Sequence, residues 1–224
     1  MRVLFITVIV ILLDQISKFY VHGINIPLLN INFEGMYLGE SISVIGEFFK
    51  ITYIENPGMA FGFDPGSEYK LIISLFSLGA SIGLLIYLYI VREKILTLRV
   101  AIALILGGAV GNLIDRMFYG LWFDYAPLFY GKVVDFFDFD FFNFSLLGRN
   151  YDRWPIFNIA DASVTIGVLI LLLFHKKHSA EDETNIEESK PDSEPTSASE
   201  QNIDNVPGMT DEINDDQPDK GKEI

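Results

Sequence analysis

Four long runs of apolar residues dominate the pattern along this chain of 224 residues. Few charges break them, and they cover residues 3–21, 69–91, 96–113 and 155–174. An α-helix needs about 20 mainly apolar residues to cross the roughly 30 Å hydrocarbon core of a bilayer. The pattern therefore predicts a membrane α-helical protein with four transmembrane helices. Asp14 and Lys18 interrupt the first run, so we expect a retained helix and not a cleaved signal peptide.

Residues 23–67 are too polar and too broken by Gly and Pro to span a membrane. We expect them outside the bilayer or along its surface, with a short strand at 48–53. The next segment, Asn56-Pro57-Gly58, is a turn signal because Pro fixes one dihedral angle and Gly accepts a positive φ. Taken alone, such a segment is more often a turn than a binding site.

The formal net charge of −14 belongs almost entirely to the last part of the chain. Residues 179–224 hold fifteen Asp and Glu against three Lys, a net charge of −12. This composition predicts a disordered acidic tail after a folded unit at residues 1–178. The folded unit is close to neutral and has no basic patch, which argues against a nucleic-acid partner.

The orientation in the membrane is expected from the positions of Lys and Arg. Six lie on each side of the predicted bilayer, so their number alone does not decide. Arg92, Lys94 and Arg99 are concentrated in the short connection between the second and third helices. We therefore expect both termini in the cytoplasm.

Cysteine and histidine usage restricts the chemistry that the chain can perform. There is no cysteine, and His22, His175 and His178 all lie at predicted ends of apolar runs. A thiolate nucleophile, a Ser–His pair and a metal site built from Cys or His are therefore not expected. Any hydrolysis must rest on carboxylates.

Polar residues gather where the third helix ends and the fourth begins. Asn112 and Arg116 are one turn apart, and Asn158 and Asp161 are three residues apart, so each pair shares a helix face. The structural alternative is that Asn158 and Asp161 only cap a helix, and that Asp115 only pairs with Arg116 or with the lysine at position 132. For Asp14 and Lys18, four apart in the first helix, an intrahelical ion pair and a direct role stay equally open.

A strand-like alternation surrounds Asp135. On a period of two, Asp135 shares its side of the strand with apolar residues, namely Val133, Phe137, Phe139 and Phe141. Asp138 and Asp140 fall on the other side, where we expect them to be solvated. Desolvation raises the pKa of a carboxyl group, and a second carboxylate beside it separates the two pKa values further. One protonated and one ionised carboxyl group are the chemistry of an aspartic peptidase.

At this level of detail the chain resembles the lipoprotein signal peptidase family, also called signal peptidase II. Five blocks carry the resemblance in order: Asp14-Gln15-x-x-Lys18, Asn56-x-Gly58-x-Ala60-Phe61, Gly107-Gly108-x-x-Gly111-Asn112-x-x-Asp115-Arg116, Val134-Asp135-Phe136 and Phe157-Asn158-x-Ala160-Asp161. One block alone would be a weak signal, but five in this order are highly specific.

The resemblance implies a four-helix protein of the bacterial inner membrane with a small extracytoplasmic β region and a surface amphipathic helix. Its activity would be removal of the signal peptide from diacylglyceryl-modified prolipoproteins, by cleavage before the lipidated cysteine. Asp135 and Asp161 would be the catalytic pair. The residues that bind substrate or support the site would be Asp14, Lys18, Asn56, Gly58, Asn112, Asp115, Arg116 and Asn158. A monomer in contact with membrane lipids, with no metal and no cofactor, is implied.

Two features of the sequence depart from the family pattern, and two other classes of protein stay open. Residues 121–132 intervene before Asp135, so Asp124 competes with it for the first catalytic role, and residues 136–153 are longer than the family pattern. Local context favours Asp135, since Asp124 runs into a turn at Ala126-Pro127. The other classes are a carboxylate-lined transporter and a non-catalytic membrane scaffold. The uncharged centres of the second and third helices disfavour a transporter.

Overall fold

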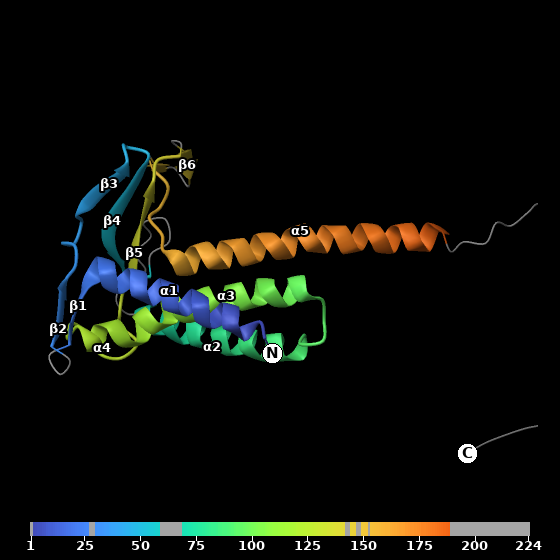
Figure 1. Cartoon of the computed structure of the whole chain (residues 1–224), viewed down its shortest axis with the longest axis horizontal. Helices are drawn as coiled ribbons and strands as arrows, with labels where there is room; N and C mark the ends of the chain where they lie inside the picture. Colours follow the sequence, from blue (N-terminus) through green and yellow to red (C-terminus); the bar gives the residue numbers. More distant parts are fainter. Residues whose placement is uncertain are drawn as a thin grey trace, which may run out of the picture.

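Four long helices lie side by side and carry small β-sheets at one end (Figure 1). The computed structural model describes residues 2–26, 30–58, 69–141, 144–146, 149–151 and 153–188. Its long helices are α1 (Leu4–His22), α2 (Tyr69–Ile90), α3 (Leu96–Ile114) and α5 (Ile159–Glu188). Helix α3 is central, since it contacts each of the other three.

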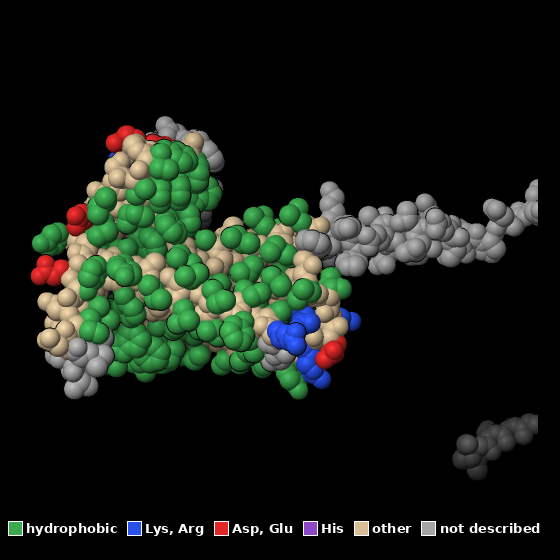
Figure 2. Space-filling model, viewed as in Figure 1, with side chains coloured by type: hydrophobic (Ala, Val, Ile, Leu, Met, Phe, Trp, Pro, Cys, Tyr) green, Lys and Arg blue, Asp and Glu red, His purple; other side chains and the backbone are tan. Residues whose placement is uncertain are grey.

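The helices have the length and surface of membrane-spanning segments. Three apolar helical stretches in the described residues are long enough to cross a bilayer: Leu4–His22, Tyr69–Ile90 and Leu96–Trp122. A shorter apolar stretch covers Ile159–Leu173. Hydrophobic side chains cover much of the outer surface of the helices (Figure 2), as expected where the solvent is lipid. The membrane α-helical class is confirmed.

The third helix does not stop at residue 113. It continues through a π-helical turn, η2 (Asp115–Tyr119), and a short α4 (Gly120–Trp122). The Gly131 N–H donates to the Arg116 carbonyl oxygen (2.9 Å), so a residue further along the chain provides a hydrogen bond to a carbonyl group of this turn. Such turns occur often at functional sites.

The fourth helix begins later and ends later than the expected 155–174. The backbone of Phe157 is still paired with Phe137 of the neighbouring strand, with N–H···O distances of 2.7 and 3.2 Å, so residues 155–157 are extended. The helix starts only after Asn158. At the other end it reaches Glu188, because residues 175–188 contain six of the strong helix formers Lys and Glu. The expected tail thus starts helical, and residues 189–224 lie outside the described residues.

Three antiparallel strands, β3 (Ser41–Ile45), β4 (Phe49–Asn56) and β5 (Val133–Phe139), form the main sheet in that order. Two hairpins accompany it: β1 (Gly23–Ile26) with β2 (Ile31–Glu34), and β6 (Phe144–Leu146) with β7 (Arg149–Tyr151). The strand expected at 48–53 is confirmed and is longer. Residues 30–58 are strands and turns, so the implied surface helix is not found in this described stretch.

Glycines on α3 let the neighbouring helices approach closely. A Cβ atom at Gly108 would lie 2.2 Å from the carbonyl oxygen of Ala160 in α5, and one at Gly111 would lie 2.7 Å from Asp14 Oδ2 in α1. At Gly108 the neighbouring atom belongs to the backbone, so the helices would have to move apart to make room for a Cβ atom. These glycines therefore bring polar groups of α1, α3 and α5 within hydrogen-bonding reach.

We predict that Gly108→Ala lowers the free energy of unfolding by about 1–3 kcal/mol, because α5 must move away from α3. The matched control is Gly83→Ala on α2, where an added Cβ meets nothing within 4 Å. This change should stay within about 0.5 kcal/mol. Thermal unfolding in detergent measures both, and equal effects of the two substitutions would contradict the packing argument.

Candidate active site

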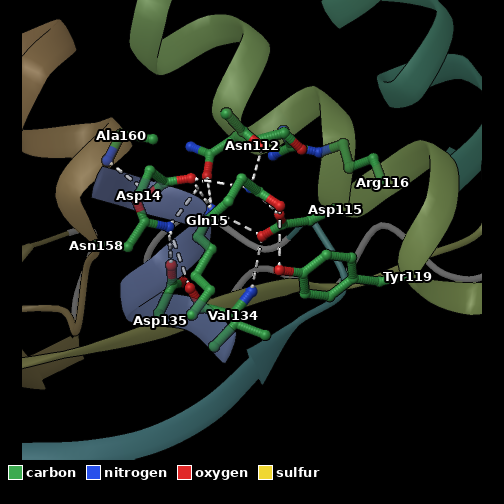
Figure 3. A network of polar contacts seen from close by, with 12 residues as sticks. Asp14, Gln15, Asn112, Asp115, Arg116, Tyr119, Val134, Asp135, Asn158 and Ala160 are labelled. Carbon is green, nitrogen blue, oxygen red and sulfur yellow. Dashed lines mark hydrogen bonds and ion pairs between the residues drawn. The ribbon is translucent and has the colours of Figure 1, made fainter. Parts of the chain in front are cut away.

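A buried lysine, Lys18, contacts polar residues of several elements, and three of its neighbours, Asp14, Asn112 and Asp115, are labelled in the polar network of Figure 3. Lys18 is fully buried, and its Nζ contacts Asp14 Oδ2 at 2.8 Å, Asp115 Oδ2 at 2.7 Å and Asn112 Oδ1 at 2.9 Å. An ammonium group has three donors, and each has an acceptor here. The intrahelical pair of Asp14 and Lys18 is thus present. Asp115 pairs with this lysine, whereas Lys132 pairs with Glu55 (2.6 Å) and Arg116 interacts with Asp115 only electrostatically.

The two carboxylates also join separate elements. Asp14 Oδ1 accepts the N–H of Ala160 in the first turn of α5 (3.0 Å). Asp115 Oδ2 accepts the N–H of Val134 in β5 (3.2 Å). The ion cluster therefore fixes α1, α3, α5 and β5 relative to one another.

Two further residues complete this cluster. Gln15 Nε2 donates to Asp115 Oδ1 (2.9 Å), and the hydroxyl of Tyr119 donates to Gln15 Oε1 (3.2 Å). Both side chains are buried. Gln15 belongs to the first sequence block, but no role was predicted for it. A polar residue inside an apolar run was the sequence feature that could have indicated one. Tyr119, one turn after Asp115, offered no signal in sequence.

Two carboxyl groups lie next to this cluster and are connected through asparagine side chains. Asn158 Nδ2 donates to Asp135 Oδ1 (2.6 Å), and Asn56 Nδ2 donates to Asp135 Oδ2 (3.1 Å). Asn112 Nδ2 donates to Asp161 Oδ1 (2.8 Å). Asn158 Nδ2 also lies 3.0 Å from Asn112 Oδ1, which closes the connection. The pair Asp135 and Asp161 and the three asparagines around it thus come from four distant segments of the chain.

Asn158 and Asp161 also cap α5. Asn158 Oδ1 accepts the N–H of Asp161 (3.0 Å), and Asp161 Oδ2 accepts the N–H of Asn158 (3.3 Å). This reciprocal arrangement is a capping box. The cap considered as a structural alternative is therefore real, and the same bonds orient the Asp161 carboxylate towards Asn112.

The electrostatics of Asp135 differ from those of an ordinary carboxyl group. Burial raises the pKa of Asp135 to about 7, and the charge of Asp161 acts in the same direction. Hydrogen bonds from Asn56 and Asn158 oppose the shift. Near neutral pH this group can therefore carry a proton and donate it.

The remaining expected residues lie around the pair. Asn56 Oδ1 accepts the N–H of Gly58 (3.0 Å), whose φ of 109° favours glycine, so this turn orients the Asn56 amide. Arg116 donates to the Asn112 carbonyl (3.3 Å) and interacts electrostatically with both Asp135 and Asp161. Ala60 and Phe61 of the same block as Asn56 lie outside the described residues.

Asp124 and Asp138 lie outside the pair. Asp124 is exposed in a turn with a φ of 55°. Asp138 was expected to be solvated, and this was wrong: it is buried, and it accepts hydrogen bonds from Thr52 Oγ1 (2.7 Å) and Arg153 Nε (2.6 Å). On this second face of β5, Thr52 and Arg153 thus cover Asp138. Asp140 is 40% exposed, as expected.

The fold and the site together define an integral membrane protein with a carboxyl pair at one end of its helices, the arrangement of a membrane peptidase. The chain belongs to the signal peptidase (SPase) II family, whose model matches residues 6–176, and it is a protease.

Individual relatives and solved structures support this family membership. The lipoprotein signal peptidase of Chlorobium phaeobacteroides is 39% identical and covers 75% of this chain and 85% of its own length. That of Syntrophus aciditrophicus is 38% identical, with coverages of 73% and 85%. A bacterial membrane enzyme structure obtained by the in meso method at 2.3 Å resolution is 32% identical, with a TM-score of 0.56 and coverages of 80% and 90%. A second, at 1.9 Å resolution, is 33% identical, with a TM-score of 0.54 and coverages of 77% and 90%.

We predict that Lys18→Met lowers the free energy of unfolding by about 3–5 kcal/mol, because two buried carboxylates lose their counter-charge. Lys50→Met, which breaks the exposed pair with Glu47 (2.5 Å), is the matched control and should cost less than about 1 kcal/mol. Adding Asp115→Asn to Lys18→Met should restore part of the loss. Unfolding in denaturant measures all three, and a further loss in the double variant would contradict the charge argument.

Proposed function

We propose that this protease removes the signal peptide from diacylglyceryl-modified prolipoproteins by cleaving before the lipidated cysteine, with Asp135 and Asp161 as the catalytic pair. Membership of the signal peptidase II family supports lipoprotein precursors as substrates. The observation that carries the mechanism is the asparagine-linked pair, in which Asp135 is 1% exposed and its pKa is raised to about 7.

The two carboxyl groups take different roles because their surroundings differ. Asp161 lies in the first turn of α5, where the partial positive charge of the helix N-terminus stabilises a negative charge. It acts as the general base that takes a proton from the attacking water. Asp135 in its protonated form donates a hydrogen bond to the scissile carbonyl. As the C–N bond breaks, the pair returns a proton to the leaving amine.

The remaining residues position these two. Asn112 and Asn158 hold one carboxyl group each and contact each other. Asn56 and Gly58 form the turn against Asp135, where an extended substrate would approach. Asp14, Lys18 and Asp115 support the site from behind, and Arg116 supplies positive charge near both acids.

The depth of the site suits a lipid-anchored substrate better than it suits transport. In the described residues the polar cluster lies at one end of the helices, and the central parts of α2 and α3 carry no charge. Lys18 already neutralises the buried Asp14 and Asp115 in part. A carboxylate path across the bilayer is therefore not supported, whereas a site at fixed depth near the surface is.

For the orientation, we propose an inner-membrane protein with both termini in the cytoplasm and the sheet on the outer side. Lys and Arg side chains gather at the end of the helices away from the sheet (Figure 2). Arg92 and Lys94 belong to the connection between α2 and α3, and Arg99 lies in the first turn of α3. Positive charge beside helix ends favours the cytoplasmic side.

We predict that Asp135→Asn and Asp161→Asn each insert and fold but lose cleavage by at least about three orders of magnitude, because either half of an acid–base pair is needed. Cleavage of a lipidated prolipoprotein by purified protein is the measurement. The matched control is Asp124→Asn, which should keep at least about a tenth of wild-type turnover. The reverse pattern would move the catalytic role to Asp124.

We also predict the pH dependence of kcat/KM. The raised pKa means that the protonated form of Asp135 is present below about pH 7 and is lost as the pH rises, so activity should fall above about pH 7. Asn56→Ala removes a hydrogen bond that lowers this pKa, and should therefore move the alkaline limb to higher pH. An alkaline limb that stays in place or moves to lower pH in this variant would contradict Asp135 as the acid.

A further inference from the structure

The two faces of the main sheet differ in chemistry. In the register of the strands, Phe49 lies opposite Phe139, and Ile51 lies opposite Phe137. On the other face, Lys50 lies opposite Asp138. This part of the sheet is thus amphipathic, with charged and hydroxyl groups on one side and aromatic rings on the other. We call the other side the aromatic face: Phe48, Phe49, Phe137, Phe139, Phe141 and Trp154.

The rings of the aromatic face contact one another. Phe49 and Phe139 stack with centroids 4.4 Å apart, and Phe139 and Phe141 stack at 5.0 Å. Trp154 meets Phe141 edge to face at 6.4 Å. These contacts hold the rings in a continuous layer that extends past the end of β5.

The rim of this layer is nevertheless exposed, while Phe49, Phe137 and Phe139 at its centre are half-buried. Phe48 is 44% exposed, Phe141 49% and Trp154 39%, and Ile45 at the edge of the sheet is 59% exposed. A sheet of a water-soluble domain would bury such a face against another layer. A contiguous exposed apolar patch marks a surface that another phase or molecule covers.

The position of the sheet indicates what covers it. The strands β3, β4 and β5 stand across the end of the helices and extend beyond α5 (Figure 1). Hydrophobic side chains gather over this part of the sheet, above the start of α5, and acidic side chains lie at its outer edge (Figure 2). The sheet therefore lies where a bilayer crossed by the helices would have its surface.

We propose that the aromatic face lies on the headgroup region of the bilayer that the helices span, and anchors the sheet there. Aromatic rings favour the boundary between hydrocarbon and water. The ion cluster of the opposite face, where Arg153 contacts Asp138 (2.6 Å) and Asp140 (3.4 Å), then faces water. This segregation of charge commits the face to lipid and not to a water-soluble partner.

The anchor has a consequence for the catalytic pair, and this step rests on the proposed function. Asp135 precedes Phe137 and Phe139 on the same strand, on the side of β5 that carries the aromatic face. The face therefore leads from the lipid surface to the carboxyl group. An anchored sheet keeps Asp135 at the depth at which a lipid-bound substrate presents its cleavage point.

Tryptophan fluorescence tests the anchor without any need for activity. The chain has two tryptophans, so Trp122→Phe leaves Trp154 as the single reporter. In phospholipid vesicles we expect Trp154 to be quenched by lipids brominated near the headgroup and protected from iodide. In detergent-free controls with unbrominated lipid, the emission should stay strong. Iodide quenching as strong as that of free tryptophan would overturn the proposal.

A matched reporter on the polar face completes this test. Ser43 lies opposite Lys50, so Ser43→Trp in a Trp122→Phe and Trp154→Phe background should remain open to iodide and unaffected by brominated lipid. Equal quenching by lipid on both faces would overturn the proposal. Protection of Trp154 from iodide without quenching by brominated lipid would also overturn it, because another part of this chain would then cover the face. Protection found only at a high protein-to-lipid ratio would overturn it too, because a second copy of the chain would then cover the face.

The catalytic consequence has its own measurement. Phe141→Ser with Trp154→Ser should lower kcat/KM for a lipidated prolipoprotein in vesicles by about tenfold, as expected from the loss of two interfacial rings. In detergent micelles the same variant should stay within about twofold of wild type. Equal losses in both would show a structural role and overturn the positioning role. If wild type itself cleaves nothing, the proposed function fails, and the fluorescence result still decides the anchor.

Discussion

The structure depends on one buried charge. Placing the Lys18 ammonium out of contact with water costs several kcal/mol unless good partners surround it. Asp14, Asp115 and Asn112 supply three acceptors at 2.7–2.9 Å, and they come from α1 and from the end of α3. Because the carboxylates also bind backbone groups of α5 and β5, the arrangement is satisfied only when all four elements converge.

This constraint continues into the proposed catalytic pair, Asp135 and Asp161. The Asn112 side chain accepts from Lys18 with its oxygen and donates to Asp161 with its nitrogen, so the lysine fixes which way the amide points. Asn158 caps α5 and holds Asp135 with the same side chain. The same side chains therefore cap the helix and hold the proposed catalytic pair, so the cap and the proposed chemistry are compatible.

Most of the architecture could be predicted from sequence, because apolar runs of spanning length dominate it. The five blocks contain residues that the structure places together, and the period of β5 placed Asp135 on the same side of the strand as Phe137 and Phe139. The predictions that were wrong concern features that depend on contacts between distant segments. The partner of Asp115 is in α1, the start of α5 is set by pairing of Phe157 with β5, and Asp138 is buried by Arg153 and Thr52. A local sequence pattern contains no information on these contacts between distant residues.

The central claim is that the network raises the pKa of Asp135 and so holds this carboxyl group protonated beside Asp161. Infrared difference spectroscopy of the carboxyl C=O stretch tests it most directly. Near pH 6, below the raised pKa of about 7, the wild type should show a protonated-carboxyl band that disappears in Asp135→Asn and persists in Asp124→Asn. In the wild type this band should fade as the pH rises through about 7. A band that is unchanged in Asp135→Asn would contradict the account.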